Sequence, residues 1–179
     1  LPDHYRRSLE ALFEITLPGG VITYPEFLAE IQTAASQASS IKAILVSDKI
    51  PPAYDLNPDH FPGLQRGPDE IALLQHSSGT TGLQKGVALS HQAIQNQISS
   101  YANALHLSKE DVVVSWLPLY HDMGLIAGFI LPILSGLRLV LLSPFDWVRA
   151  PQKLLHAISA YQGSLCWLPN FAYNFCAQK

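Results

Sequence analysis

Charged side chains are scarce in this sequence. Only 14% of its 179 residues are Asp, Glu, Lys or Arg, whereas 48% are hydrophobic, and the formal net charge is −3. So much apolar content with so little charge excludes an intrinsically disordered chain. The 11 Lys and Arg residues do not outnumber the 14 Asp and Glu residues. A nucleic-acid binder that works by electrostatics is therefore excluded, because no basic surplus is present to neutralise phosphates.

Cysteine is scarce as well, since only Cys166 and Cys176 are present. Two cysteines cannot form a disulfide framework, and neither a CxxC pair nor a Cys/His spacing typical of a metal site occurs. We expect two reduced thiols in a packed segment, no metal ligands, and a cytoplasmic protein.

The sequence also lacks an initiating Met, a signal peptide and a polar tail. It begins at Leu1 and stops at Lys179, within a stretch from Pro169 onward that has a helical pattern. We expect the chain to be a partial piece of a longer protein.

A long uninterrupted hydrophobic run is missing too. Residues 124–142 contain a single charge, Arg138, and approach the length of a transmembrane helix. Pro132, Ser135 and Gly136 interrupt the stretch, and the Val-Leu-Leu run after Arg138 is typical of a strand. A buried helix, a turn and a buried strand explain this stretch. We therefore expect no transmembrane span, and peripheral contact with a membrane stays open.

Strand and helix patterns alternate along the chain. Strands are predicted at 21–24, 41–46, 71–74, 87–89, 112–116, 137–142 and 164–168, and helices at 3–17, 25–38, 90–105, 124–134 and 151–161. This order is typical of an α/β fold with mainly parallel sheets flanked by helices. We expect an α/β part at 1–50, a Pro-rich connecting loop at 51–68 and a second α/β part at 69–179.

The most informative segment is the run His-Ser-Ser-Gly-Thr-Thr-Gly-Leu-Gln-Lys-Gly at 76–86. A packed core has no use for four hydroxyls, because each one needs a hydrogen-bond partner. A phosphate would use them: glycines let backbone N–H groups approach its oxygens, hydroxyls donate, and a lysine supplies the opposite charge. The alternative is a Ser- and Gly-rich hairpin turn, but such a turn needs only about two to five residues and no lysine.

The two common nucleotide loops do not fit this segment. In a Walker A loop the lysine precedes Ser or Thr and a helix, whereas Lys85 precedes Gly86 and a strand. The GxGxxG fingerprint is absent as well. The pattern therefore predicts a phosphate clamp between two strands.

The run from Ser77 to Gly86 resembles the phosphate-loop signature of the adenylate-forming superfamily, Ser/Thr-Ser-Gly-Thr/Ser-Thr-Gly-x-Pro-Lys-Gly. It matches at every position except Gln84, where proline is usual. A second run, Leu-Pro-Leu-Tyr-His-Asp-Met-Gly at 117–124, is similar to the family's LPxxHxxG motif. The surrounding residues, with Trp-Leu-Pro-Asn-Phe-Ala-Tyr at 167–173, most resemble the long-chain fatty acyl branch, which comprises fatty acyl-CoA synthetases and fatty acyl-AMP ligases. The resemblance implies an incomplete part of the large N-terminal domain.

Members of this superfamily join a carboxylic acid to ATP, release pyrophosphate, and pass the acyl group to a thiol. The resemblance therefore implies a ligase for a fatty acid, with ATP and Mg²⁺ as cofactors and coenzyme A or a carrier-protein pantetheine as acceptor. The family's magnesium-binding motif, ribose-binding aspartate and catalytic lysine lie downstream of Lys179. We expect this piece alone to be inactive.

The candidate site residues follow from the two motifs. The residues expected at the ATP phosphates are Ser77, Ser78, Gly79, Thr80, Thr81, Gly82 and Lys85. By resemblance, His121 lies where the acyl pocket meets the nucleotide and contacts or gates the carboxylate. Taken alone, the His121–Asp122 pair also fits a structural histidine, a helix cap by Asp122, or half of a metal dyad.

Further residues are matched to the acyl pocket by position only: Met123, Gly128, Phe129, Pro169, Asn170 and Phe171. An apolar residue lies more often in the core than in a pocket. The three tryptophans, Trp116, Trp147 and Trp167, are assigned to packing.

Two other classes of function stay open: a non-catalytic α/β module that binds phosphate, and an enzyme that adenylates an amino or aryl acid. The effect of Gln84 also stays open, because proline would stiffen the approach to Lys85 by fixing φ and glutamine does not.

Overall fold

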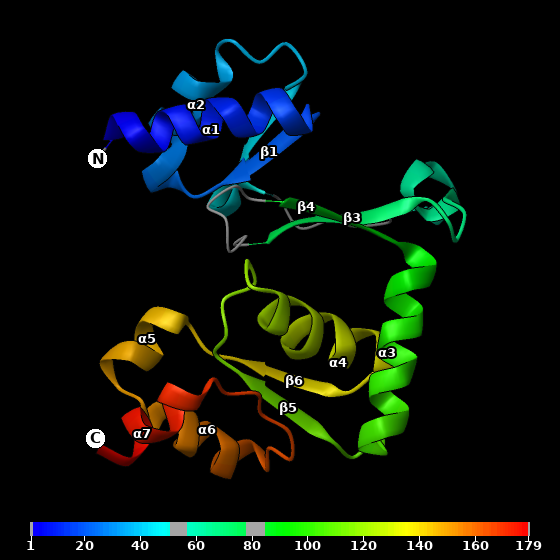
Figure 1. Cartoon of the computed structure of the whole chain (residues 1–179), viewed down its shortest axis with the longest axis vertical. Coiled ribbons are helices and arrows are strands. Elements are labelled where there is room, and N and C mark those ends of the chain that lie inside the picture. The colour runs from blue at the N-terminus through cyan, green and yellow to red at the C-terminus, as the bar shows by residue number, and fades with distance from the viewer. Residues whose placement is uncertain (1, 51–56, 78–84, 179) are drawn as a thin grey trace. The chain divides into compact units, whose positions relative to one another are not determined.

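The computed structural model describes residues 2–50, 57–77 and 85–178. They divide into two compact units, 1–61 and 62–179 (Figure 1). Both units contain strands and helices, as the sequence predicts for an α/β fold; the two alternate in the first unit, whereas the second begins with two consecutive strands and ends with three consecutive helices.

The described part of the first unit contains two helices, two strands and three short 3₁₀ turns. Their bounds are α1 Pro2–Thr16, β1 Gly20–Thr23, η1 Pro25–Phe27, α2 Leu28–Ala35, β2 Ala43–Val46, η2 Ser47–Lys49 and η3 Pro58–His60. β1 and β2 pair in parallel with Val21 opposite Ile44. Phe13 of α1 and Ile31 and Ala34 of α2 form the core, and Val21 and Ile44 pack against it. The apolar stripes of two helices thus cover one face of a two-stranded parallel sheet.

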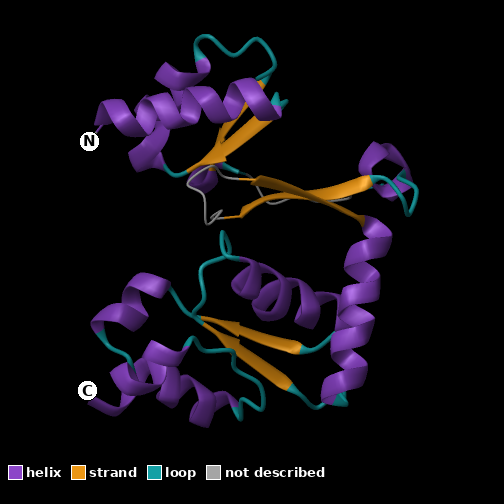
Figure 2. Ribbon diagram, viewed as in Figure 1, coloured by secondary structure: helices purple, strands orange, loops and turns teal. Residues whose placement is uncertain are grey.

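The second unit contains the elements η4 Pro62–Gln65, β3 Ile71–Ser77, β4 Lys85–Ser90, α3 His91–Leu105, β5 Val112–Ser115, η5 Met123–Ile130, α4 Leu131–Ser135, β6 Arg138–Leu141, α5 Pro144–Arg149, α6 Gln152–Tyr161 and α7 Asn170–Gln178. β3 and β4 form an antiparallel hairpin, and β5 and β6 pair in parallel. Helices lie on both sides of the β5–β6 pair, with η5 and α4 on one side and α6 and α7 on the other (Figure 2). Coverage on both faces explains why all four residues of β5 are buried.

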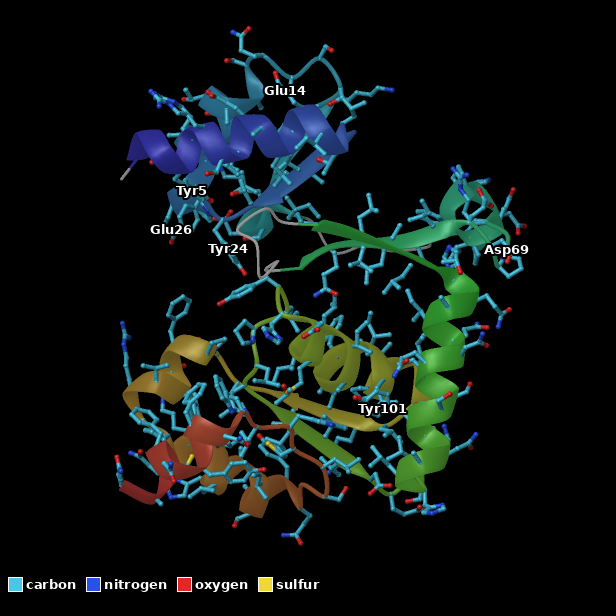
Figure 3. The ribbon with its side chains drawn as sticks, viewed as in Figure 1. Tyr5, Glu14, Tyr24, Glu26, Asp69 and Tyr101 are labelled. Atoms are coloured by element: carbon cyan, nitrogen blue, oxygen red, sulfur yellow. The ribbon has the colours of Figure 1, made fainter. Side chains whose placement is uncertain are left out.

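The long helix α3 begins where the sequence places its cap. The Ser90 hydroxyl accepts the Ala93 N–H at 3.1 Å, which satisfies one of the unpaired donors at a helix start. The helix ends at His106, whose φ of 52° is left-handed. Tyr101 projects from α3 on the side of the helix that faces α4 (Figure 3).

The core of the second unit gathers around β5. Its buried members are Val112, Val114, Trp116, Leu117, Trp147, Leu154 and Ala172, contributed by β5, by the two residues that follow β5 and by helices α5, α6 and α7. Trp116 and Trp147 are buried and Trp167 packs against the same cluster. The assignment of the three tryptophans to packing is therefore confirmed.

Two parts of the predicted secondary structure differ from the observed one. The strand predicted at 164–168 is wrong, because only Leu165 forms a bridge with β5, opposite Val113. The Ser164 and Leu165 N–H groups both donate to the Val112 carbonyl, so no regular ladder develops. Helix α5 was not predicted.

The hydrophobic stretch 124–142 folds as η5, α4, a turn at Gly136 and β6. Among the residues that the structure describes, no helix combines the length and apolarity that crossing a membrane requires.

Candidate functional site

The predicted phosphate loop connects the two strands of the β3–β4 hairpin. The backbone register pairs Ser77 with Lys85 and His76 with Gly86. The first and last phosphate-loop residues therefore lie opposite each other on adjacent strands. Ser78, Gly79, Thr80, Thr81 and Gly82 lie outside the described residues, so the role assigned to the loop stays a prediction.

The second motif forms the turn that leaves β5. Leu117 is buried, Pro118 is half-buried, and the chain is exposed from Leu119 through His121. The His121 N–H donates to the Pro118 carbonyl at 3.1 Å, and the His121 carbonyl accepts the Leu125 N–H at 2.8 Å. The backbone of His121 is thus bonded both to the residues that leave the strand and to the helical segment that follows.

Gly124, the last residue of the motif, is required by close packing. A Cβ placed on it would lie 2.3 Å from the Pro118 carbonyl oxygen and 3.0 Å from the Leu117 Cβ. No real side chain tolerates such a contact with backbone, because carbonyl oxygens at this position cannot yield. The spacing of proline, histidine and glycine in the motif therefore has a steric reason that is independent of any ligand.

The side chains of His121 and Asp122 form a surface pair. His121 Nδ1 lies 2.8 Å from Asp122 Oδ1. The Met123 N–H donates to the same carboxylate oxygen at 2.7 Å, and its nitrogen also lies 3.3 Å from Nδ1, a longer contact that is a hydrogen bond only when Nδ1 carries no proton. We assign the ring proton to Nδ1, since a lone pair there would face the carboxylate. Nε2 is then the ring nitrogen for which no described residue supplies a hydrogen-bond partner, and it is our candidate to meet a ligand.

Asp122 therefore acts as the cap of η5, one of the roles considered for it from the sequence. The two side chains are 61% and 75% exposed. Their pairing orients the ring, but it contributes little to folding stability at such exposure.

The six residues matched to the acyl pocket lie at two places in the second unit. Met123, Gly128 and Phe129 belong to η5, and Pro169, Asn170 and Phe171 lie at the start of α7. Met123, Asn170 and Phe171 are exposed, Phe129 and Pro169 are half-buried, and Gly128 is buried against Ser115. Their part in binding an acyl chain stays a prediction.

An aromatic cluster connects the start of α7 to the end of β5. Trp147 of α5 stacks on Trp116 with ring centroids 3.6 Å apart. It also meets Phe171 edge-on at 6.3 Å and Phe175 at 5.3 Å. Sequence reasoning missed α5, which carries Trp147. Proline at its first position, directly after Ser143, was the available signal.

A concave region lies at the end of the β5–β6 pair where both strands begin, opposite the end that leads to His121. This cavity of about 330 Å³ is lined by Lys109, Glu110, Asp111, Val112, Arg138, Ala160, Tyr161 and Gln162. Its charges are of both signs, so it favours no particular ligand charge. Within 2–50, 57–77 and 85–178, no three His, Cys, Asp or Glu residues gather in a way that could hold a metal ion.

Comparison with known proteins identifies the family. A model of the AMP-binding enzyme family matches residues 7–179. The chain belongs to the AMP-binding enzyme family. This membership agrees with the resemblance that the two motifs carry.

Relatives of this AMP-binding family chain include named ligases. It is 33% identical to a putative ligase, Rv1013, of Mycobacterium tuberculosis over 89% of its own length and 28% of the relative's. It is 32% identical to the medium-chain-fatty-acid–[acyl-carrier-protein] ligase JamA of Moorena producens, over 96% and 29%. It is 31% identical to the long-chain-fatty-acid–AMP ligase FadD28 of Mycobacterium tuberculosis, over 80% and 25%.

Solved structures show the same similarity. One chain from work on fatty acyl-adenylate ligases of E. coli and L. pneumophila superposes with a TM-score of 0.83 at 28% identity, over 98% of this chain and 31% of that one. A fatty acyl-adenylate ligase of L. pneumophila in complex with acyl adenylate and pyrophosphate superposes with a TM-score of 0.76 at 25% identity, over 97% and 29%. The AMP-binding chain thus spans less than a third of the length of these proteins.

Proposed function

We propose that the protein containing this chain activates a fatty acid as its acyl adenylate, with ATP as co-substrate and pyrophosphate as product, and then passes the acyl group to a thiol. The observation that carries the proposal is the β3–β4 hairpin of an AMP-binding family member. Its register sets Ser77 opposite Lys85, so that a hydroxyl- and glycine-rich connection begins and ends at adjacent strand positions.

The chemistry that such a loop supplies is electrostatic. A carboxylate and a triphosphate repel each other, so donors and a cation must hold the phosphates while the acid attacks the α-phosphorus. Hydroxyls of Ser77, Ser78, Thr80 and Thr81 would bind phosphate oxygens, and Gly79 and Gly82 would let the backbone approach. Lys85 would neutralise the departing pyrophosphate. Mg²⁺ would neutralise part of the same phosphate charge, and the residues that bind it would lie outside this chain.

We assign to His121 the role of contacting the carboxylate of the fatty acid. No described residue hydrogen-bonds its Nε2, Asp122 contacts its other ring nitrogen, and its backbone is bonded on both sides. The fatty acid as substrate is supported by the named fatty-acid ligases among the relatives. The acceptor is either coenzyme A or a carrier-protein pantetheine, since the relatives include both a carrier-protein ligase and a putative fatty-acid–CoA ligase.

The test is carboxylate-dependent exchange of pyrophosphate into ATP by the full-length protein, with acids from short to long chain. Exchange should rise with aliphatic chain length. Lys85→Ala and Thr81→Ala should each lower the exchange rate by about 10²-fold or more, the cost of losing one preorganised donor in a transition state. Unchanged exchange in both variants would remove the phosphate loop from the mechanism.

His121→Ala separates acid binding from nucleotide binding. We expect a higher KM for the acid or an altered chain-length preference, with the KM for ATP unchanged. An amino acid belongs in the same panel, because a McyG adenylation protein solved with phenylalanyl-adenylate superposes with a TM-score of 0.78 at 26% identity. Exchange with phenylalanine rather than with fatty acids would favour adenylation of an amino acid.

A further inference from the structure

A buried hydroxyl lies directly beneath the turn that carries His121. Ser115 is the last residue of β5, follows three valines, and is 1% exposed. Its Oγ accepts the Leu117 N–H at 3.3 Å, and its carbonyl accepts the Leu142 N–H at 2.8 Å. A single residue therefore connects the exit of β5 both to the following turn and to the end of β6.

The helical segment η5 lies directly on that hydroxyl. A Cβ on Gly128 would come within 2.6 Å of Ser115 Oγ and 3.2 Å of its Cβ. Gly124, four residues earlier, is in equally close contact with the Pro118 carbonyl. Residues four apart share one side of a helical segment. The two glycines thus place η5 against residues 115–118.

The backbone geometry of η5 is unusual. Its eight residues, Met123–Ile130, are π-helical, and the Leu131 N–H continues the pattern by donating to the Ile126 carbonyl. π-helical turns are rare, usually short, and concentrated at functional sites, because their geometry is less favourable than that of an α-helix. A structural helix at this position would not need such a segment.

The backbone of His121 is hydrogen-bonded to the turn after β5 on one side and to η5 on the other. Its N–H is bonded to Pro118, which Gly124 contacts, and its carbonyl is bonded to Leu125 of η5. A change in the separation of β5 and η5 must therefore move the backbone of His121, since both anchors move relative to each other. Ser115 of β5 and Gly128 of η5 are in close contact at this separation.

We propose that Ser115 and Gly128 are positioning residues for His121: the Ser115 hydroxyl, packed on the bare backbone of Gly128, sets where the imidazole Nε2 lies. Neither residue needs to touch a substrate. The inference rests on the proposed function, in which His121 contacts the carboxylate of the acid.

The experiment uses four variants of the full-length protein. Gly128→Ala adds a methyl group against the hydroxyl, and Ser115→Ala removes the hydroxyl. The double variant, Ser115→Gly with Gly128→Ala, adds the methyl group at residue 128 and removes the hydroxymethyl group at residue 115 that the methyl group would meet. Gly63→Ala is the matched control, because a Cβ there meets nothing within 4 Å. Each variant is measured for the KM of acid and of ATP per folded molecule, and for the imidazole resonance of His121, assigned with His121→Gln.

Gly128→Ala should raise the KM of the acid or lower the exchange rate by about 10- to 100-fold, the cost of displacing a reacting group by roughly an ångström. The KM of ATP should stay at the wild-type value. Ser115→Ala should change the acid KM in the same direction by less. The double variant should recover most of the loss, and the His121 resonance should shift and return in parallel. Gly63→Ala should match the wild type throughout.

A merely structural role gives a different result: fewer folded molecules, with an unchanged acid KM and an unchanged His121 resonance in those that fold. That outcome overturns the proposal. If Gly128→Ala does not fold, the proposal is tested with Ser115→Ala, which adds no atoms. The acid KM and the His121 resonance of that variant then decide between a positioning and a merely structural role. If the wild-type protein shows no exchange with any acid, the proposed function fails, and the His121 resonance still tests the positioning.

Discussion

The indole rings of Trp116 and Trp147 stack face to face, with centroids 3.6 Å apart and planes 10° from parallel. Trp116 directly precedes the turn that carries His121, and Trp147 is the most buried residue of α5. Within the described residues neither indole N–H has a hydrogen-bond partner. The contact is therefore stabilised by buried apolar surface and by dispersion attraction between the rings, and it fixes α5 against the end of β5.

Removing this contact should be costly. Trp147→Ala should lower the free energy of unfolding by about 3–5 kcal/mol, the usual cost of deleting a large buried aromatic side chain. Trp147→Phe should cost less, because it keeps a ring and loses no hydrogen bond. The matched control is Phe145→Ala on the same helix, where the side chain is 78% exposed and the expected change is within about 0.5 kcal/mol. Denaturant titration followed by near-UV circular dichroism measures all three. Equal losses for Trp147→Ala and Phe145→Ala would contradict the structure.

The glycine of the second motif should tolerate no side chain. Gly124→Ala places a methyl group against the Pro118 carbonyl oxygen, and overpacking of this kind costs about 1–3 kcal/mol. Gly63→Ala serves as the control, since nothing lies within 4 Å of its added Cβ. Melting temperatures of the two variants compare them directly. A Gly124→Ala protein that melts with the wild type would show that η5 and the Pro118 backbone are farther apart than described.

A hydrogen-bonded carboxylate should make the second unit sensitive to acid. The Ser108 N–H donates to Asp111 Oδ2 at 2.8 Å, and the Ser164 hydroxyl donates to Oδ1 at 2.7 Å. These bonds lower the pKa of Asp111 below its ordinary value, the Ser108 backbone bond contributing most. Because the pKa is lower in the folded state, the stabilisation is present above the unfolded pKa of about 3.9. It is lost as pH falls through the folded value.

Ser164→Ala tests this linkage. Its hydroxyl also accepts the Val112 N–H at 3.0 Å, so the variant should melt below the wild type at neutral pH. The part of the difference that comes from Asp111 should shrink as pH falls below the unfolded pKa of about 3.9, and it should vanish only when pH lies below the lowered folded pKa of Asp111, where the carboxylate is protonated in both proteins. The pKa of Asp111, followed by NMR, should rise in the variant. A difference in melting temperature that stays constant from neutral to acid pH would exclude the role of the carboxylate.

The Cys166 thiol should be unreactive in the folded protein. Burial, with a smaller contribution from Cys176, raises the pKa of Cys166 to about 11. The thiolate is the nucleophile, so alkylation of Cys166 at pH 8 should be much slower in the folded protein than in the same protein in urea. Peptide mapping by mass spectrometry gives both rates, and equal rates would show that the thiol is not shielded.

The same shift has a consequence for stability. A thiol whose pKa is raised by folding contributes stability below its unfolded pKa of about 8.5. That contribution is lost as pH rises toward about 11, the folded value. Cys166→Ala should therefore lose less stability than the wild type between these two pH values. An identical alkaline decline in both proteins would assign the decline to other groups.

Local signals in the sequence were sufficient for most elements. The Ser90 cap of α3, the apolar periodicity of α1 and the apolar runs of β3 and β5 each depend on residues close together in the chain. They were predicted because capping and amphipathic patterns act over a few residues. The two motifs also identified the family without any structure.

Contacts between segments that are far apart in the sequence were decided by the tertiary structure. The strand predicted at 164–168 is observed only as a single bridge at Leu165. Its pairing depends on how the chain returns to β5 and not on its own composition. The stacking of Trp147 on Trp116 and the packing of Gly128 on Ser115 join residues that no local pattern connects.

The sequence by itself therefore determined the family, the order of elements and the candidate loop and histidine. The tertiary structure decided which groups support them: Asp122 at the imidazole, Gly124 at the Pro118 carbonyl and Gly128 on the Ser115 hydroxyl. The reason is physical. Helix caps and periodicity depend on near neighbours in the chain, whereas a close approach of backbone to side chain depends on the packing of elements that only the folded chain brings together.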